Sequence, residues 1–181
     1  MEIDIDTEME MEIEMENHKI YVRPALIQDL PLILSFIQAL AEYEKLRDQC
    51  VATIEDLKQT LFCDQPFAQV VIAAYEGQAV GFALYFYNYS TFLAKPGIYL
   101  EDLFVLEDFR GKGVGFALLQ HLAKIAVDKG CGRFEWSVLD WNTPAISFYR
   151  KIGAVGMDDW TVQRLEGEGI LRLAELKISG N

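Results

Sequence analysis

The stretch of the chain best suited to binding chemistry is RGKGVG, residues 110–115, in which three glycines alternate with Arg110, Lys112 and Val114. It follows the apolar run IYLEDLFVL and precedes the periodic run FALLQHLAKIAV, so it lies where a strand is expected to pass into a helix. Glycine at such a turn lets backbone N–H groups approach a ligand closely. A helix N-terminus adds unpaired donors and a partial positive charge. The pattern therefore predicts an anion site, most often one for phosphate.

Two well-known phosphate motifs do not fit this stretch. An NTPase loop needs Ser or Thr directly after its lysine, and Gly113 follows Lys112 here. The dinucleotide fingerprint opens a βαβ unit with its first strand, whereas three strands are expected before Arg110. Taken alone, the glycines indicate a structural turn as readily as a ligand loop.

The hydrophobic pattern around this turn predicts a mixed α/β (α+β) domain. Asp29 is expected to cap a first long helix, Thr53 and Asp56 have capping-box spacing, and Gly130 is expected to end the helix after the glycine turn. An EGQ turn predicts a β-hairpin. The expected strands cover 18–24, 68–75, 79–89, 98–106 and 133–140, with a closing pair in the last 25 residues, and the expected helices cover 28–46, 53–62, 116–130 and 143–153.

Composition narrows the class of protein. The chain has 181 residues, of which 51% are hydrophobic, and its net charge of −12 argues against non-specific nucleic-acid binding. No apolar run reaches membrane-spanning length, and no signal peptide pattern is present. Three cysteines without a CxxC pair and only two histidines argue against a zinc or other metal site. We expect an intracellular, cytoplasmic protein with neither a nucleic-acid nor a membrane partner.

Most of the acidity belongs to residues 1–17, which hold eight acids and no Lys or Arg, so the remainder carries −12 + 8 = −4. We divide the chain into this acidic N-terminal extension and a domain over 18–181. The extension alternates acidic and mostly apolar residues with the period of a strand, although like charges on one face resist pairing. It is either a mobile extension or an added edge strand on a partner subunit.

Several blocks occur in an order that resembles the GNAT N-acetyltransferase superfamily. Arg110, Gly113 and Gly115 fit its pyrophosphate loop, R/Q-x-x-G-x-G/A. The blocks LAEYEKLRDQ, YFYNYS, YLEDLFV, RGKGVG, DKGC, VLDWN and FYRKIGA resemble the diamine (spermidine/spermine-like) N-acetyltransferase family over about 18–165. YSTF, DKGC and VLDWN are closest to its thialysine N-ε-acetyltransferase branch. The resemblance implies a single-domain GNAT fold, with a mixed central sheet of about six or seven strands and helices on both faces, and a homodimer.

The resemblance implies acetyl-CoA as co-substrate and no metal. Backbone amides from Gly111 to Phe116 would hold the pyrophosphate, and pantetheine would lie like a short strand beside a splayed strand, whose amide polarises the thioester carbonyl. The cofactor-binding residues expected on this basis are Leu103, Phe104, Val105, Arg110, Gly111, Lys112, Gly113, Val114, Gly115, Phe116, Asn142 and Tyr149.

Two catalytic residues follow from the same resemblance. An amine with a pKa of ~10.4 must lose a proton before it attacks, and Glu101 is the expected acceptor, acting through water. Glu101 and Asp102 should point to opposite faces of a regular strand, so only one can face the reaction. Tyr149 is the expected general acid for the departing thiolate. The residue types alone leave open an ion-paired Glu101 and a Tyr149 that belongs to the core.

The expected reaction is acetyl transfer to a small cationic amine, a thialysine- or lysine-like amino acid or a short diamine, by direct attack in a ternary complex. Expected substrate contacts are Tyr43, Glu44, Glu101, Glu135, Trp136 and Ser137. Ser90-Thr91-Phe92 stands where the polyamine branch has Asp-Pro-Trp, which disfavours long polyamines. The alternatives are a spermidine/spermine acetyltransferase, an enzyme acting on protein amines, or a non-catalytic acyl-CoA-binding regulatory module.

Overall fold

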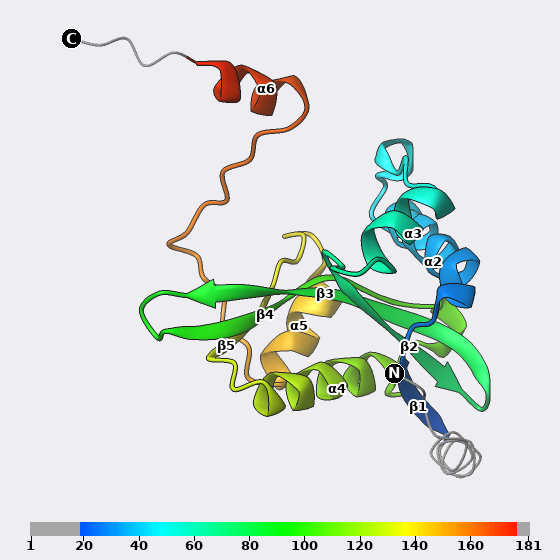
Figure 1. The fold of residues 1–181 in the computed structure, drawn as a ribbon. Helices are drawn as coiled ribbons and strands as arrows, with labels where there is room; N and C mark the ends of the chain where they lie inside the picture. The colour runs from blue at the N-terminus through cyan, green and yellow to red at the C-terminus, as the bar shows by residue number, and fades with distance from the viewer. Residues whose placement is uncertain (1–18, 177–181) are drawn as a thin grey trace. The chain divides into compact units, whose positions relative to one another are not determined.

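A mixed sheet is the framework of the first part of the chain (Figure 1). The computed structural model describes residues 19–176, which divide into two compact units, the first ending at Ser137 and the second beginning at Val138. The five strands of the first unit stand in the order β1-β2-β3-β4-β5, antiparallel except for the parallel pair β4–β5. Their bounds are β1 Ile20–Pro24, β2 Gln69–Tyr75, β3 Gln78–Ser90, β4 Lys95–Val105 and β5 Arg133–Trp136.

The hairpin predicted from the EGQ turn is confirmed. Glu76 and Gly77 connect β2 to β3 with φ angles of 49° and 80°. Two successive residues at positive φ are the conformation of the hairpin turns whose twist matches that of the strands. The turn sets the register of β2 and β3 beside it, from Tyr75 opposite Gln78 to Ala74 opposite Ala79.

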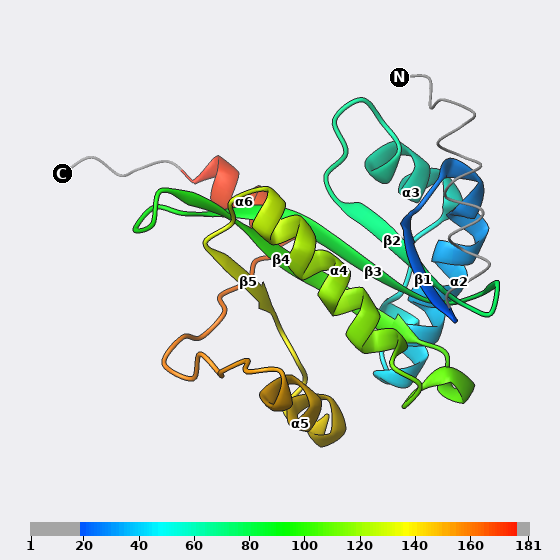
Figure 2. The same cartoon turned by 90° about the horizontal axis from the view of Figure 1, so that it is seen from below.

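Helices cover both faces of this sheet, as expected. Helices α2 (Leu30–Tyr43) and α3 (Ile54–Leu61) lie on one face, and α4 (Val114–Asp128) lies on the other (Figures 1 and 2). Short 3-10 turns occupy Ile27–Asp29, Arg47–Gln49 and Glu107–Phe109.

The core on the α2 face is built on three phenylalanines from three elements. The ring of Phe36 on α2 lies 5.7 Å from that of Phe82 on β3 and 6.1 Å from that of Phe104 on β4. On the other face, Leu118 and Leu122 of α4 are fully buried. Because side chains alternate across a strand, Phe104 packs toward α2, and the side chains of the residues before and after it point to the opposite face of the sheet.

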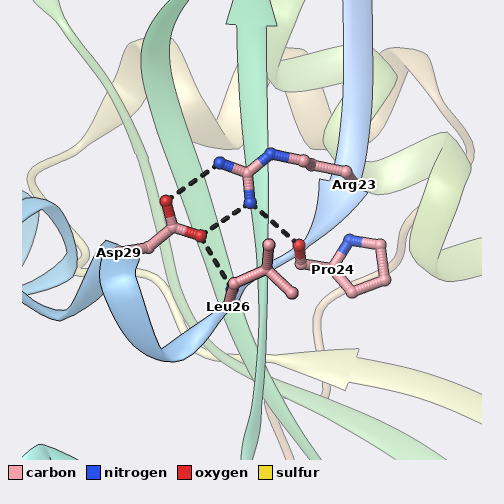
Figure 3. A network of polar contacts seen from close by, with 4 residues as sticks. All are labelled: Arg23, Pro24, Leu26 and Asp29. Carbon is pink, nitrogen blue, oxygen red and sulfur yellow. Dashed lines mark hydrogen bonds and ion pairs between the residues drawn. The ribbon is translucent and has the colours of Figure 1, made fainter. Parts of the chain in front are cut away.

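Two of the predicted helix ends are confirmed and one differs. Thr53 and Asp56 form the capping box at the start of α3, and Gly130 follows α4 in a left-handed conformation, at φ 65°. Asp29 does precede α2, but its carboxylate makes no capping bond there. Both oxygens instead accept hydrogen bonds from Arg23, at 2.6 and 2.9 Å, and one also accepts from the Leu26 N–H (Figure 3). Hydrogen bonds from Arg23 lower the pKa of Asp29 and tie the end of β1 to the start of α2.

The second unit, described by itself, contains two helices and no strand among its described residues, 138–176. These are α5 (Thr143–Lys151) and α6 (Glu168–Glu175). The closing pair of strands expected in the last 25 residues is therefore wrong for the part that the structure describes, which has five strands rather than six or seven. Leu, Ala, Glu and Arg favour helix in α6, and Glu168 pairs with Arg172 one turn later at 3.5 Å. The acidic extension lies outside the described residues.

Candidate active site

Strand β4 loses its partner on one side part-way along its length. β5 pairs with β4 only from Gly97 to Leu100, and within residues 19–176 no other strand covers that side from Glu101 to Val105. On the other side, pairing with β3 continues to Val105. The two strands therefore separate after Leu100, which leaves a short open edge.

Backbone alternation decides which residues face this edge. The Leu106 N–H donates to the Val80 carbonyl at 2.9 Å, so even-numbered residues at this end of β4 bond to β3. In an antiparallel ladder the residues between them direct their N–H and C=O groups the other way. Leu103 and Val105 thus present backbone groups to the open edge, while Phe104 contributes its ring to the core.

A β-bulge lies at Glu101. Leu84 is opposite Asp102 and Tyr85 is opposite Leu100, so Glu101 is the extra residue on β4. The expectation that Glu101 and Asp102 point to opposite faces assumed a regular strand, and the bulge interrupts that alternation. Bulges re-aim side chains and are common beside active sites.

Asp102 is a carboxyl group that the sequence reasoning passed over in favour of Glu101. Burial, followed by the nearby charges of Glu101 and Glu44, raises the pKa of Asp102 to about 6. Glu44 follows the end of α2, and burial raises its pKa as well. The fold therefore gathers carboxyl groups from α2 and β4, among them the expected Glu44 and Glu101. The sequence could not indicate the importance of Asp102, because the bulge beside it depends on pairing with β3.

The glycine turn has the geometry of an anion cradle. Gly111 and Gly113 have φ angles of 73° and 91°, and Gly113 precedes α4 without any side-chain cap. The first bond of the helix runs from the Ala117 N–H to the Gly113 carbonyl at 2.9 Å. The amides of Val114, Gly115 and Phe116 come before that bond and have no acceptor within the helix. These donors fit a phosphate, as the sequence predicted.

Gly115 lies close to the end of β4. A Cβ atom built on Gly115 would be 3.9 Å from Cγ2 of Val105, with no closer neighbour outside its own helix. The cradle and the open edge of β4 are therefore adjacent, and a single extended ligand could reach both.

Both cations of the turn lie over aromatic rings. The guanidinium carbon of Arg110 is 4.6 Å from the ring centroid of Tyr43 and 5.8 Å from that of Phe104. Its Nε donates to the Val105 carbonyl at 3.0 Å. Lys112 Nζ lies 5.3 Å from the ring of Tyr75 and 4.8 Å from that of Phe109. These contacts fix the turn against β2, β4 and α2.

The expected substrate residues on β5 belong to a polar network. Glu135 pairs with Arg133 at 2.9 Å and accepts from Asn88 Nδ2 at 2.9 Å. Ser137 Oγ lies 2.7 Å from Tyr99 Oη, and the ring of Trp136 packs edge-on against Phe134. Because the Glu135 carboxylate already has two partners, its contact with a substrate stays a prediction.

Asn142 and Tyr149 belong to the second unit. Asn142 Oδ1 accepts from the Ala145 N–H at 3.4 Å and so caps α5. The ring of Tyr149 lies 5.5 Å from that of Phe148 on the same helix. Their roles toward the cofactor stay predictions.

Comparison with known proteins decides the family. Residues 38–154 match the sequence model of the acetyltransferase (GNAT) family. The chain belongs to this family. It is 39% identical to the thialysine N-epsilon-acetyltransferase of Sus scrofa over 166 residues, which cover 86% of this chain and 97% of the relative. It is 32% identical to an L-ornithine N5-acetyltransferase of Arabidopsis thaliana, covering 90% of this chain and 92% of the relative.

A solved structure agrees with the family. An integron cassette protein from the mobile metagenome of V. cholerae aligns with a TM-score of 0.73 at 29% identity, covering 88% of this chain and 99% of that one. The expected GNAT fold and N-acetyltransferase class are therefore confirmed, and the chain is an acetyl-CoA-dependent amine N-acetyltransferase. In residues 19–176, no helix is long and apolar enough to span a membrane, and no group of three or more His, Cys, Asp or Glu side chains is arranged to hold a metal ion.

We predict that Asp102→Asn stabilises the protein above pH 6 and that the gain disappears as the pH falls toward 4. The pKa of Asp102 rises from 3.8 in the unfolded chain to about 6 on folding, so the folded state is penalised once this carboxyl ionises. That shift corresponds to at most about 3 kcal/mol, reduced by solvent screening. Urea unfolding of both proteins between pH 4 and 8 measures the difference.

The control for this experiment is Asp128→Asn, which removes an exposed carboxylate from the end of α4. It should not reproduce the pH-dependent gain. A difference between wild type and Asp102→Asn that is constant with pH, or a loss of stability at pH 8, would contradict the burial of an ionisable Asp102.

Proposed function

We propose that this acetyltransferase acts on the side-chain amine of a small cationic amino acid, such as thialysine or a lysine-like molecule, or on a short diamine. The observation that carries the proposal is the bulge in β4 at Glu101, beside a buried Asp102 on which the charges of Glu101 and Glu44 both act. Grouped carboxylates favour a cationic group, and they lie at the edge where β4 loses its partner. The relatives named for thialysine and L-ornithine, which align over nearly their whole length, support the same substrate class.

Acetyl-CoA would occupy the cradle and the open edge together. In this proposal the amides from Gly111 to Phe116 hold the pyrophosphate, with charge from Lys112 nearby. Pantetheine lies along the backbone groups of Leu103 and the N–H of Val105, whose carbonyl accepts from Arg110, and Asn142 contacts it from α5. The thioester supplies an activated acetyl group, and the N–H of Leu103 is directed to stabilise the oxyanion that forms on its carbonyl oxygen.

The transfer itself is a direct displacement in the ternary complex. The amine nitrogen attacks the thioester carbon, its proton passes through water to Glu101, and the carbon–sulfur bond breaks. The leaving thiolate takes a proton from Tyr149. Tyr43, Glu44, Glu135, Trp136 and Ser137 are proposed to surround the amine. A homodimer and a cytoplasmic location stay predictions from the family resemblance.

The tip of the β3–β4 hairpin supports a short substrate. Phe92 is 98% exposed, and Ser90 is buried with its Oγ accepting from the Leu93 N–H at 3.3 Å. No residue from Ser90 to Phe92 carries a carboxylate that could bind the far end of a long polyamine.

We predict that thialysine, lysine, ornithine or a short diamine has a higher kcat/KM than spermine. Each charge-assisted hydrogen bond that a polyamine cannot make is worth ~1.5–3 kcal/mol, roughly tenfold to a hundredfold in specificity. CoA release, measured for the whole set of amines at one pH, provides the ranking. Spermine as the best substrate would place the chain with polyamine acetyltransferases, and no release with any amine would favour a binding module.

We predict that Tyr149→Phe lowers kcat by ~10²–10⁴ because it removes a positioned proton donor and keeps the ring. Acetyl-CoA affinity, measured by calorimetry, should change little. The matched control is Phe148→Tyr, which alters the neighbouring ring on the same helix. Near-normal turnover in Tyr149→Phe would exclude this residue as the general acid.

A further inference from the structure

Arg110 connects three elements of the site through one planar group. The side chain starts in the glycine turn, its Nε donates to the Val105 carbonyl at 3.0 Å, and its guanidinium covers the ring of Tyr43 at 4.6 Å. Val105 belongs to the open edge of β4, and Tyr43 is the last residue of α2. Arg110 thus connects the glycine turn to the end of α2, where Tyr43 and Glu44 are proposed to contact the amine substrate.

The residue after Tyr43 is Glu44, whose charge acts on Asp102. α2 ends there, because Lys45 adopts a left-handed conformation, at φ 63°, and turns the chain away. Glu44 is the next residue in the chain, so the contact that holds Tyr43 lies at the same end of α2 as Glu44.

One face of the Tyr43 ring is already covered by a cation. An aromatic face that carries a guanidinium repels a second positive charge, so a cationic amine cannot use that face. On that side of the ring, the attraction for the amine is left to the carboxyl groups.

We propose that Arg110 is a positioning residue for the amine substrate, which fastens Tyr43 to β4 and sets Glu44 beside Asp102. The inference rests on the proposed function for its substrate. In this proposal the Arg110 guanidinium positions residues that bind the amine, and the backbone amides of the turn hold the pyrophosphate. The planar guanidinium can stack on Tyr43 and donate to Val105 at the same time, which a lysine ammonium cannot do.

The test is a double-mutant cycle of Arg110→Lys and Tyr43→Leu, read out by steady-state kinetics, by acetyl-CoA calorimetry and by urea unfolding. Arg110→Lys keeps the positive charge, but it loses the planar group that stacks on Tyr43 and donates to Val105 at the same time. We expect it to raise KM for thialysine about three- to tenfold, with kcat and acetyl-CoA affinity each changed less than about twofold. The double variant should be scarcely worse than Tyr43→Leu alone, because both changes break one contact.

Lys58→Met is the control, since it removes an exposed cation from α3, on a helix that contributes no residue to the proposed site. It should leave KM for thialysine unchanged. A loss confined to acetyl-CoA affinity in Arg110→Lys, or additive effects in the cycle, would overturn the inference. If the proposed function is wrong, the wild type releases no CoA with any amine. If the Arg110–Tyr43 contact is wrong, the changes in unfolding free energy of the two single variants add up to that of the double variant, whatever the activity.

Discussion

The end of pairing between β4 and β5 after Leu100 is the constraint on which the rest of the site depends. Beyond this point β4 is held by β3 on one side and by the Phe104 ring, which packs with Phe36 and Phe82. This part of β4 is therefore held in place although no second strand pairs with it among residues 19–176. An exposed edge normally invites association with other chains. Here it is only a few residues long, and Arg110 covers the carbonyl at its end.

Two opposite electrostatic environments meet at this edge. The glycine turn and the start of α4 direct amide donors and the partial positive charge of the helix toward one end. The bulge at Glu101 and the end of α2 bring carboxyl groups to the other. An acyl-CoA and a cationic amine carry the complementary charges. The separation of charge along β4 is thus consistent with the acetyltransferase family and with a cationic acceptor.

The parts of the fold that sequence patterns predicted are those set by local chemistry. The EGQ hairpin, the Thr53–Asp56 capping box and the glycines before α4 each depend on a few neighbouring residues. The bulge at Glu101 depends on the register between β3 and β4, which no local pattern encodes. The raised pKa of Asp102 follows from its burial and from the charges of Glu101 and Glu44, the second of which comes from a distant part of the chain. The stacking of Arg110 on Tyr43 joins residues far apart in the chain, so spacing alone could not indicate it. The closing strands expected in the last 25 residues fall on a segment in which α6 has the composition of a helix.

The most direct test of the central claim is calorimetry of acetyl-CoA binding to wild type, Gly115→Ala and Gly115→Asp. Gly115 has ordinary backbone angles and its nearest neighbour would be 3.9 Å from a new Cβ, so both variants should fold, whereas Gly113 needs its φ of 91°. If the start of α4 holds the pyrophosphate, Gly115→Asp places a negative charge against it and should weaken binding by at least about tenfold relative to Gly115→Ala. Equal affinity of the two folded variants would show that the pyrophosphate lies elsewhere.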